Sequence, residues 1–121
     1  MLHDRLTSFK YAWQGIRTLF STQPNARIHL LFAGGVIMAG VFFDLSRQEW
    51  CLLVLAMALV LGAEAFNSSV EAVVDLVSPE HHALAGRAKD LAAGAVLLCA
   101  IGAAAIGLLI FLPRVLDWWQ S

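Results

Sequence analysis

A run of twenty-two residues without a charge, from Leu91 to Leu112, constrains this chain more than any other feature. About 20 apolar residues in a helix cross a hydrocarbon core about 30 Å thick, so the run predicts a transmembrane helix. Two shorter apolar runs precede it, from Ile28 to Phe43 and from Trp50 to Ala63. Because 60% of the 121 residues are hydrophobic and only 14% are charged, a soluble domain of this size could not bury them. We expect an all-α membrane protein whose spans cover residues 26–44, 49–77 and 79–113.

The segment before the first span has a different pattern. On a helix its apolar residues fall within an arc of about 80°, and they are Leu2, Leu6, Phe9, Trp13, Ile16 and Phe20. This pattern predicts an amphipathic helix over residues 1–22 that lies in the membrane interface. The alternative for this segment is a core helix of a soluble bundle. Tyr11 falls almost opposite the apolar stripe, where it faces away from the membrane.

The distribution of basic residues predicts the orientation. Four precede the apolar run that begins at Ile28 and one follows it, in the order Arg5, Lys10, Arg17, Arg27 and Arg47. Since basic loops stay on the cytoplasmic side, we expect a cytoplasmic N-terminus, a cytoplasmic second loop and an external C-terminus. In that second loop, Ser78 followed by Pro79 is typical of the N-cap and first position of a helix.

Charge and cysteine usage exclude some functions. The net charge of −1 gives no surplus of basic residues with which to bind nucleic acid. Cys51 and Cys99 lie inside apolar runs, and their separation fits no zinc motif, so we expect both to be reduced.

Four polar residues interrupt the second expected span at helical spacing, and they are Glu64, Asn67, Glu71 and Asp75. At 100° per residue they form one stripe about 80° wide. Counted from Trp50, the lipid-depth segment ends near Ser69, so Glu64 lies within the membrane at a cost of roughly 2.5 kcal/mol or more. Such a carboxylate is a functional candidate. The repulsion between stacked acids is relieved by a divalent cation with oxygen ligands or by protonation of one of them.

The alternative interpretation is that Glu71 and Asp75 form a solvated face paired with Arg87 or Lys89. Glu64 and Asn67 do not fit it, because no lysine or arginine lies in the adjacent turns.

The loop after the stripe returns charge to the same membrane edge through Glu80, His81, His82, Lys89 and Asp90. Lys89 could bind phosphate oxygens and Asp90 could share a cation, whereas a histidine pair in a loop is usually solvated surface. The sequence has no Walker A loop, GxGxxG, HExxH or protein-kinase catalytic loop. A phosphate site would therefore be assembled from helix faces.

Two stretches, EAFNSSVEAVVD at residues 64–75 and HALAGRAKDLAAGAVLL at residues 82–98, closely resemble the prokaryotic diacylglycerol kinase and undecaprenol kinase family. The resemblance includes YAWQGIR at residues 11–17 and NARIHL at residues 25–30, and it covers about residues 5–112. It implies a homotrimer of three-span subunits with a surface helix and active sites shared between subunits. The implied reaction transfers the γ-phosphate of ATP, with magnesium, to a lipid alcohol at the cytoplasmic face of the inner membrane.

By position, the resemblance implies that Glu64 is the general base, that Asn67 supports it, and that Glu71 binds magnesium and the nucleotide. It implies nucleotide contacts for Tyr11, Glu80, His81, His82, Lys89 and Asp90. Gln23 departs from the pattern, because many members carry a second metal-binding glutamate there; its amide oxygen can still bind a metal, without charge.

Two questions stay open at this point. The acceptor is undecaprenol or diacylglycerol, since hydrophobic walls for either tail look alike in sequence. The competing function is a non-enzymatic cation-binding membrane subunit, or a transporter helper, that uses the acidic stripe without ATP.

Overall fold

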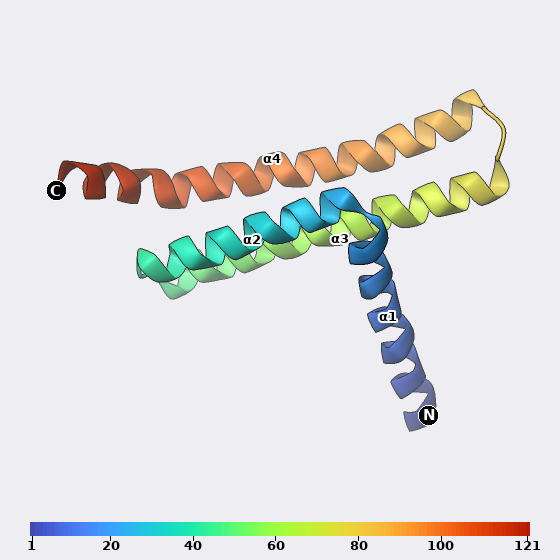
Figure 1. Cartoon of the computed structure of the whole chain (residues 1–121), viewed down its shortest axis with the longest axis horizontal. Coiled ribbons are helices and arrows are strands. Elements are labelled where there is room, and N and C mark those ends of the chain that lie inside the picture. The colour runs from blue at the N-terminus through green and yellow to red at the C-terminus, as the bar shows by residue number, and fades with distance from the viewer.

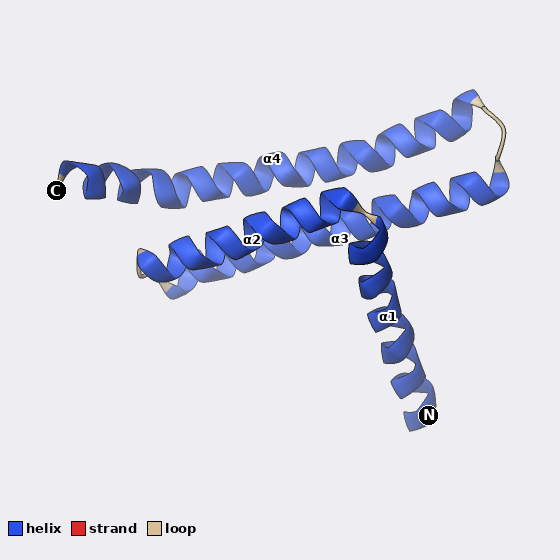
Figure 2. Cartoon of the chain, in the orientation of Figure 1, coloured by secondary structure: helices blue, strands red, loops and turns tan.

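The computed structural model describes residues 1–121 as four helices without a strand (Figure 2). They are α1 (Leu2–Thr22), α2 (Pro24–Phe42), α3 (Arg47–Val77) and α4 (Ala83–Gln120). The last three are long and apolar enough to cross a membrane. Figure 1 shows α2 beside α3, α4 running along α3, and α1 leaving the bundle at a steep angle. The predicted fold class, an all-α protein with three spans and a separate N-terminal helix, is confirmed.

The turn between α2 and α3 is defined by backbone hydrogen bonds. Asp44 has a φ of 52°, a left-handed conformation that short polar side chains tolerate better than most. Its N–H donates to the carbonyl of Val41, and the N–H of Leu45 donates to the carbonyl of Gly40, each over 3.3 Å. These two bonds form a Schellman motif, which satisfies the last carbonyls of α2. The two spans can therefore reverse direction within a few residues.

A capping box starts α3 at the same turn. The Ser46 hydroxyl accepts from the N–H of Glu49, and the Glu49 carboxylate accepts from the N–H of Ser46. The same carboxylate accepts two hydrogen bonds from the Arg114 guanidinium, over 2.5 and 2.6 Å. Since Arg114 lies near the end of α4, this bidentate pair connects the first turn of α3 to the last part of α4.

The joint between α1 and α2 is closed by Arg27. Its guanidinium donates to the carbonyls of Phe20 and Ser21, each over 2.6 Å, and so satisfies the end of α1. Gln23 is extended between the two helices, and Pro24 takes the first position of α2, where its missing N–H costs nothing.

The N-terminus predicted for the third span is wrong. Ser78 is the C-cap of α3 instead, and α4 begins at Ala83 with His82 as N-cap. The His82 Nδ1 accepts from the N–H of Leu84 over 3.1 Å, so an imidazole does the capping that the Ser-Pro pattern assigned to a hydroxyl. The Ser78 hydroxyl donates to the carbonyl of Glu80 and stabilises the turn.

The third span also extends further than residue 113. Pro113 lies inside α4, which continues to Gln120. Beyond the proline, the Arg114 guanidinium donates to the Glu49 carboxylate and to the carbonyl of Ile110. The uncharged run on which the predicted span rests ends at Leu112, and the pairing of Arg114 with Glu49 on another helix is not visible in it.

Only 9 of 121 residues are buried, and the apolar faces of the spans therefore point outward. Leu45, Leu53 and Ile110 form the one small cluster inside the bundle. Outward apolar faces suit a protein surrounded by lipid or by other subunits.

We predict that Gly40→Ala destabilises the protein. A Cβ at Gly40 would lie 2.6 Å from the Trp50 ring, which is closer than carbon atoms pack. The expected cost is about 1–3 kcal/mol, measured as a lower midpoint of thermal unfolding in detergent. The matched control is Gly34→Ala on the same helix, where nothing lies within 4 Å. Equal midpoints for the two variants would contradict the close approach of Trp50 to α2.

Candidate functional site

Glu64 lies in the middle of α3 and is only 3% exposed. One of its carboxylate oxygens, Oε1, lies 3.2 Å from the Nε2 of His29 on α2. The carboxylate faces the inside of the bundle, as expected for an acid at membrane depth. This partner was not predicted, because His29 lies on a different helix and is not adjacent to Glu64 in the sequence.

Asn67 and Glu71 lie on the following turns of the same face. The Asn67 amide nitrogen donates to the Glu71 carboxylate over 3.5 Å. The Asn67 Oδ1 is buried and has no hydrogen-bond partner. A buried carbonyl oxygen without a partner is uncommon, so this atom is available to a donor or a cation.

At the end of the acidic stripe, Asp75 agrees with the alternative interpretation, in which it pairs with a basic residue of the next helix. Asp75 accepts a hydrogen bond from the Lys89 ammonium over 2.5 Å, which connects the end of α3 to the start of α4. Both side chains line a polar pocket of about 310 Å³ together with Glu80, His81 and His82. The structure therefore brings a cation, two carboxylates and two imidazoles together at the turn.

Three predicted site residues stand apart from these groups. Tyr11 is exposed on α1 and does not line the polar pocket at the α3–α4 turn. Asp90 is exposed beside Lys89 but does not line the polar pocket. Gln23 lines a groove of about 540 Å³ between α1 and α3, beside Ser68 and Ser69.

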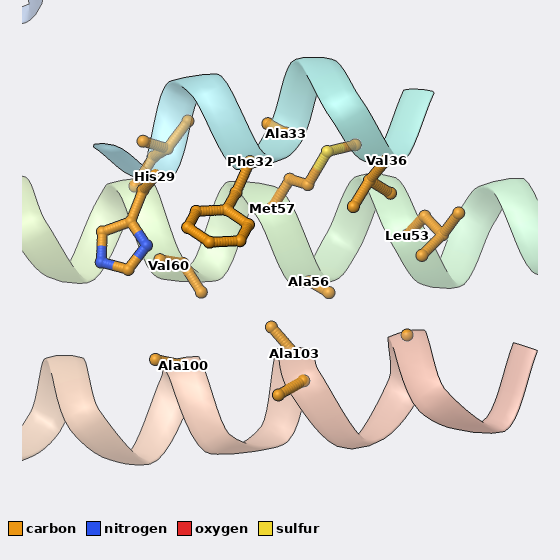
Figure 3. A pocket seen from close by; sticks show the side chains of 13 residues that line it. His29, Phe32, Ala33, Val36, Leu53, Ala56, Met57, Val60, Ala100 and Ala103 are labelled. Carbon is orange, nitrogen blue, oxygen red and sulfur yellow. The ribbon is translucent and has the colours of Figure 1, made fainter. Parts of the chain in front are cut away.

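His29 is the residue that sequence reasoning missed. It lines an apolar cavity of about 300 Å³ between α2, α3 and α4. Figure 3 shows its imidazole projecting from α2 at one end of the lining, next to Phe32 and Val60. The available signal was that His29 is the only titratable residue of the first apolar run.

The single chain does not contain a preformed metal cluster, since no group of three His, Cys, Asp or Glu side chains is arranged so that it could hold a metal ion. The oxygens near Glu71 nevertheless have the right chemistry for a hard cation. Magnesium is commonly held by one or two protein carboxylates, with substrate phosphates and water completing the coordination. The unpaired Asn67 Oδ1 is a further oxygen donor beside the Glu71 carboxylate.

Together the fold and the site define a small polytopic membrane protein with its polar chemistry gathered along the middle span and at one turn. The family model described as prokaryotic diacylglycerol kinase matches residues 10–111. The chain belongs to this family, which makes it a bacterial membrane protein of the lipid kinase class. The alternative of a non-enzymatic cation-binding subunit is not favoured by this membership.

Individual relatives agree with the family. A diacylglycerol kinase of Synechocystis is 45% identical over 93% of this chain and 65% of its own length. An undecaprenol kinase of Bacillus subtilis is 40% identical over 89% of this chain and 88% of its own. A diacylglycerol kinase of Escherichia coli is 33% identical over 75% of each chain. This chain thus spans less than two thirds of the Synechocystis relative but most of the other two.

We predict that Asp75→Asn hardly changes thermal stability. The Asp75–Lys89 pair is largely exposed, and exposed pairs contribute little because water screens them. The midpoint of thermal unfolding should move by no more than a few degrees. Asp4→Asn, which removes the exposed pair between Asp4 and the N-terminus, is the matched control. A loss as large as that expected for Gly40→Ala would mean that the pair holds α3 and α4 together.

Proposed function

We propose that this chain is an ATP- and magnesium-dependent kinase that phosphorylates a lipid alcohol at the cytoplasmic face of the bacterial inner membrane. The observation that carries the proposal is the burial of Glu64 on one face with Asn67 and Glu71. A desolvated carboxylate can act as a base, and a second carboxylate two turns away can hold a cation. Phosphoryl transfer needs little more than positioning, charge stabilisation and one base.

In the proposed reaction, Glu64 takes the proton of the lipid hydroxyl as its oxygen attacks the γ-phosphorus of ATP. The new oxygen–phosphorus bond forms as the bond to the bridging oxygen breaks, and ADP leaves. The position of Glu64 in the apolar interior suits a lipid whose hydroxyl reaches the site from the membrane.

Glu71 would hold the magnesium, with the Asn67 Oδ1 as a neighbouring oxygen donor. When bound, the ion supplies positive charge to the β- and γ-phosphates. Gln23 is a second candidate ligand, because its amide lies in the groove between α1 and α3. An amide oxygen carries no formal charge, so it would contribute less than a carboxylate.

The polar pocket at the α3–α4 turn is the proposed nucleotide site. Lys89 offers an ammonium group to phosphate oxygens, and its present partner Asp75 is exposed and readily solvated when the pair opens. Glu80, His81 and His82 line the same pocket. Tyr11 and Asp90 complete the proposed nucleotide contacts, although they lie outside the pocket in the single chain.

A homotrimer would explain why the site is divided. The outward apolar faces of the spans leave room for neighbouring subunits, and Tyr11 is exposed on α1, which projects from the bundle (Figure 1). In a trimer, Tyr11 would contact the nucleotide site of a neighbouring subunit. The proposed orientation has the N-terminus and the α3–α4 turn in the cytoplasm, where ATP is found. The basic residues before the first span support it.

The test of the lipid acceptor is a side-by-side assay. Purified protein in mixed micelles receives magnesium, ATP and either undecaprenol or diacylglycerol, and phosphorylated lipid is counted. We expect phosphate transfer to one alcohol with a clearly higher kcat/KM, and no transfer when magnesium is chelated. Magnesium binding without phosphate transfer to either alcohol would contradict the kinase and favour the cation-binding alternative.

We predict that Glu64→Gln lowers kcat by about 10²- to 10⁴-fold while the KM for ATP stays within a few fold, because the amide cannot accept the hydroxyl proton. The comparison variant is Glu49→Gln, the same chemical change at the opposite end of α3, which should keep its activity. A folded Glu64→Gln protein with full turnover would remove Glu64 from the reaction.

A further inference from the structure

The Glu64 carboxylate has one polar side-chain partner in this chain, the His29 imidazole. The Nε2–Oε1 distance is 3.2 Å, and the side chains are 4% and 27% exposed. Neither a lysine nor an arginine pairs with Glu64, since the other ion pairs involve Asp4, Asp75 and Glu49. The Ser68 hydroxyl donates to the Glu64 backbone carbonyl and leaves the carboxylate untouched.

Placing the His29 imidazole among apolar side chains costs free energy unless its nitrogen atoms make polar contacts. It extends from α2 into the space between α2, α3 and α4, and it is the only polar residue lining the cavity there (Figure 3). An apolar side chain would fill this position without a desolvation penalty. The His29 Nε2 lies 3.2 Å from Oε1 of the buried Glu64 carboxylate, and a hydrogen bond between these two atoms would recover that cost.

We propose that His29 is a positioning residue for phosphoryl transfer, which holds the Glu64 carboxylate in its reactive orientation. This inference rests on the proposed role of Glu64 as the general base. The Nε2–H of a neutral imidazole donates to Oε1, and this bond fixes the rotation of the carboxylate. Oε2 is then left free to receive the proton of the lipid hydroxyl.

The proton balance of the step is simple. The lipid hydroxyl loses its proton to Oε2 as its oxygen bonds to the γ-phosphorus, and ADP leaves with the bridging oxygen. His29 keeps its own proton throughout.

The experiment compares three substitutions of His29. His29→Leu removes the donor, and kcat should fall by about 10- to 100-fold, the range for a hydrogen bond to a charged group. The KM for ATP should stay within about twofold, because the nucleotide pocket at the α3–α4 turn does not include His29.

His29→Gln and His29→Asn separate geometry from polarity. The glutamine amide nitrogen lies near the position of Nε2, so it can still donate to Glu64 and should restore kcat to within about threefold of the wild type. The asparagine amide is shorter and lies near the position of Nδ1, so it should remain as slow as leucine. His3→Leu, an imidazole removed from the exposed start of α1, should behave as wild type.

A double substitution tests whether His29 acts through Glu64. In a Glu64→Gln background, adding His29→Leu should lower the residual rate by less than about twofold. Full activity in His29→Leu, equal activity in the glutamine and asparagine variants, or an undiminished effect in the double variant would each overturn the inference. An active wild type with an impaired Glu64→Gln variant would leave the proposed kinase function intact in all three cases, whereas an inactive wild type would overturn that function itself.

Discussion

A carboxylate among membrane helices must have a hydrogen-bond donor, and this requirement organises the centre of the molecule. Glu64 lies where lipid would be its neighbour if it pointed outward. It turns inward instead and meets His29, which places α2 against the middle of α3 at that depth. Asn67 and Glu71 then follow on the next turns of the same face. One buried polar contact thus marks the face of α3 that points into the bundle and that we propose carries the chemistry.

The other polar contacts lie at the ends of the helices, where water or headgroups can replace them. Arg27 closes the joint of α1 and α2, and Asp75 pairs with Lys89 near the α3–α4 turn. Water reaches these groups, so they can exchange partners without a large desolvation cost. Such exchange is what the proposed nucleotide site requires, because incoming phosphates would have to displace Asp75 from Lys89.

Much of the fold follows from the sequence because membrane spans are defined by length and charge alone. The three apolar runs and the amphipathic segment correspond to the four helices, and the spacing from Glu64 to Asp75 correctly predicts a shared stripe. The sequence-based prediction is wrong where a local sequence motif suggests a helix start that the folded chain places elsewhere. Ser78 and Pro79 look like a helix start, yet the His82 imidazole caps α4 instead. The contact between His29 and Glu64 joins two helices, so no periodicity along one of them could reveal it.

The bidentate pair between Glu49 and Arg114 has a mechanical consequence. It joins the first turn of α3 to the last part of α4, while at the opposite end these helices are joined by a short chain segment and one exposed ion pair. The two helices are therefore held together at both ends, by a covalent turn at one and by this non-covalent pair at the other. If the pair opened, the covalent turn beside the polar pocket would act as the hinge, and α3 and α4 would separate most between Glu49 and Arg114.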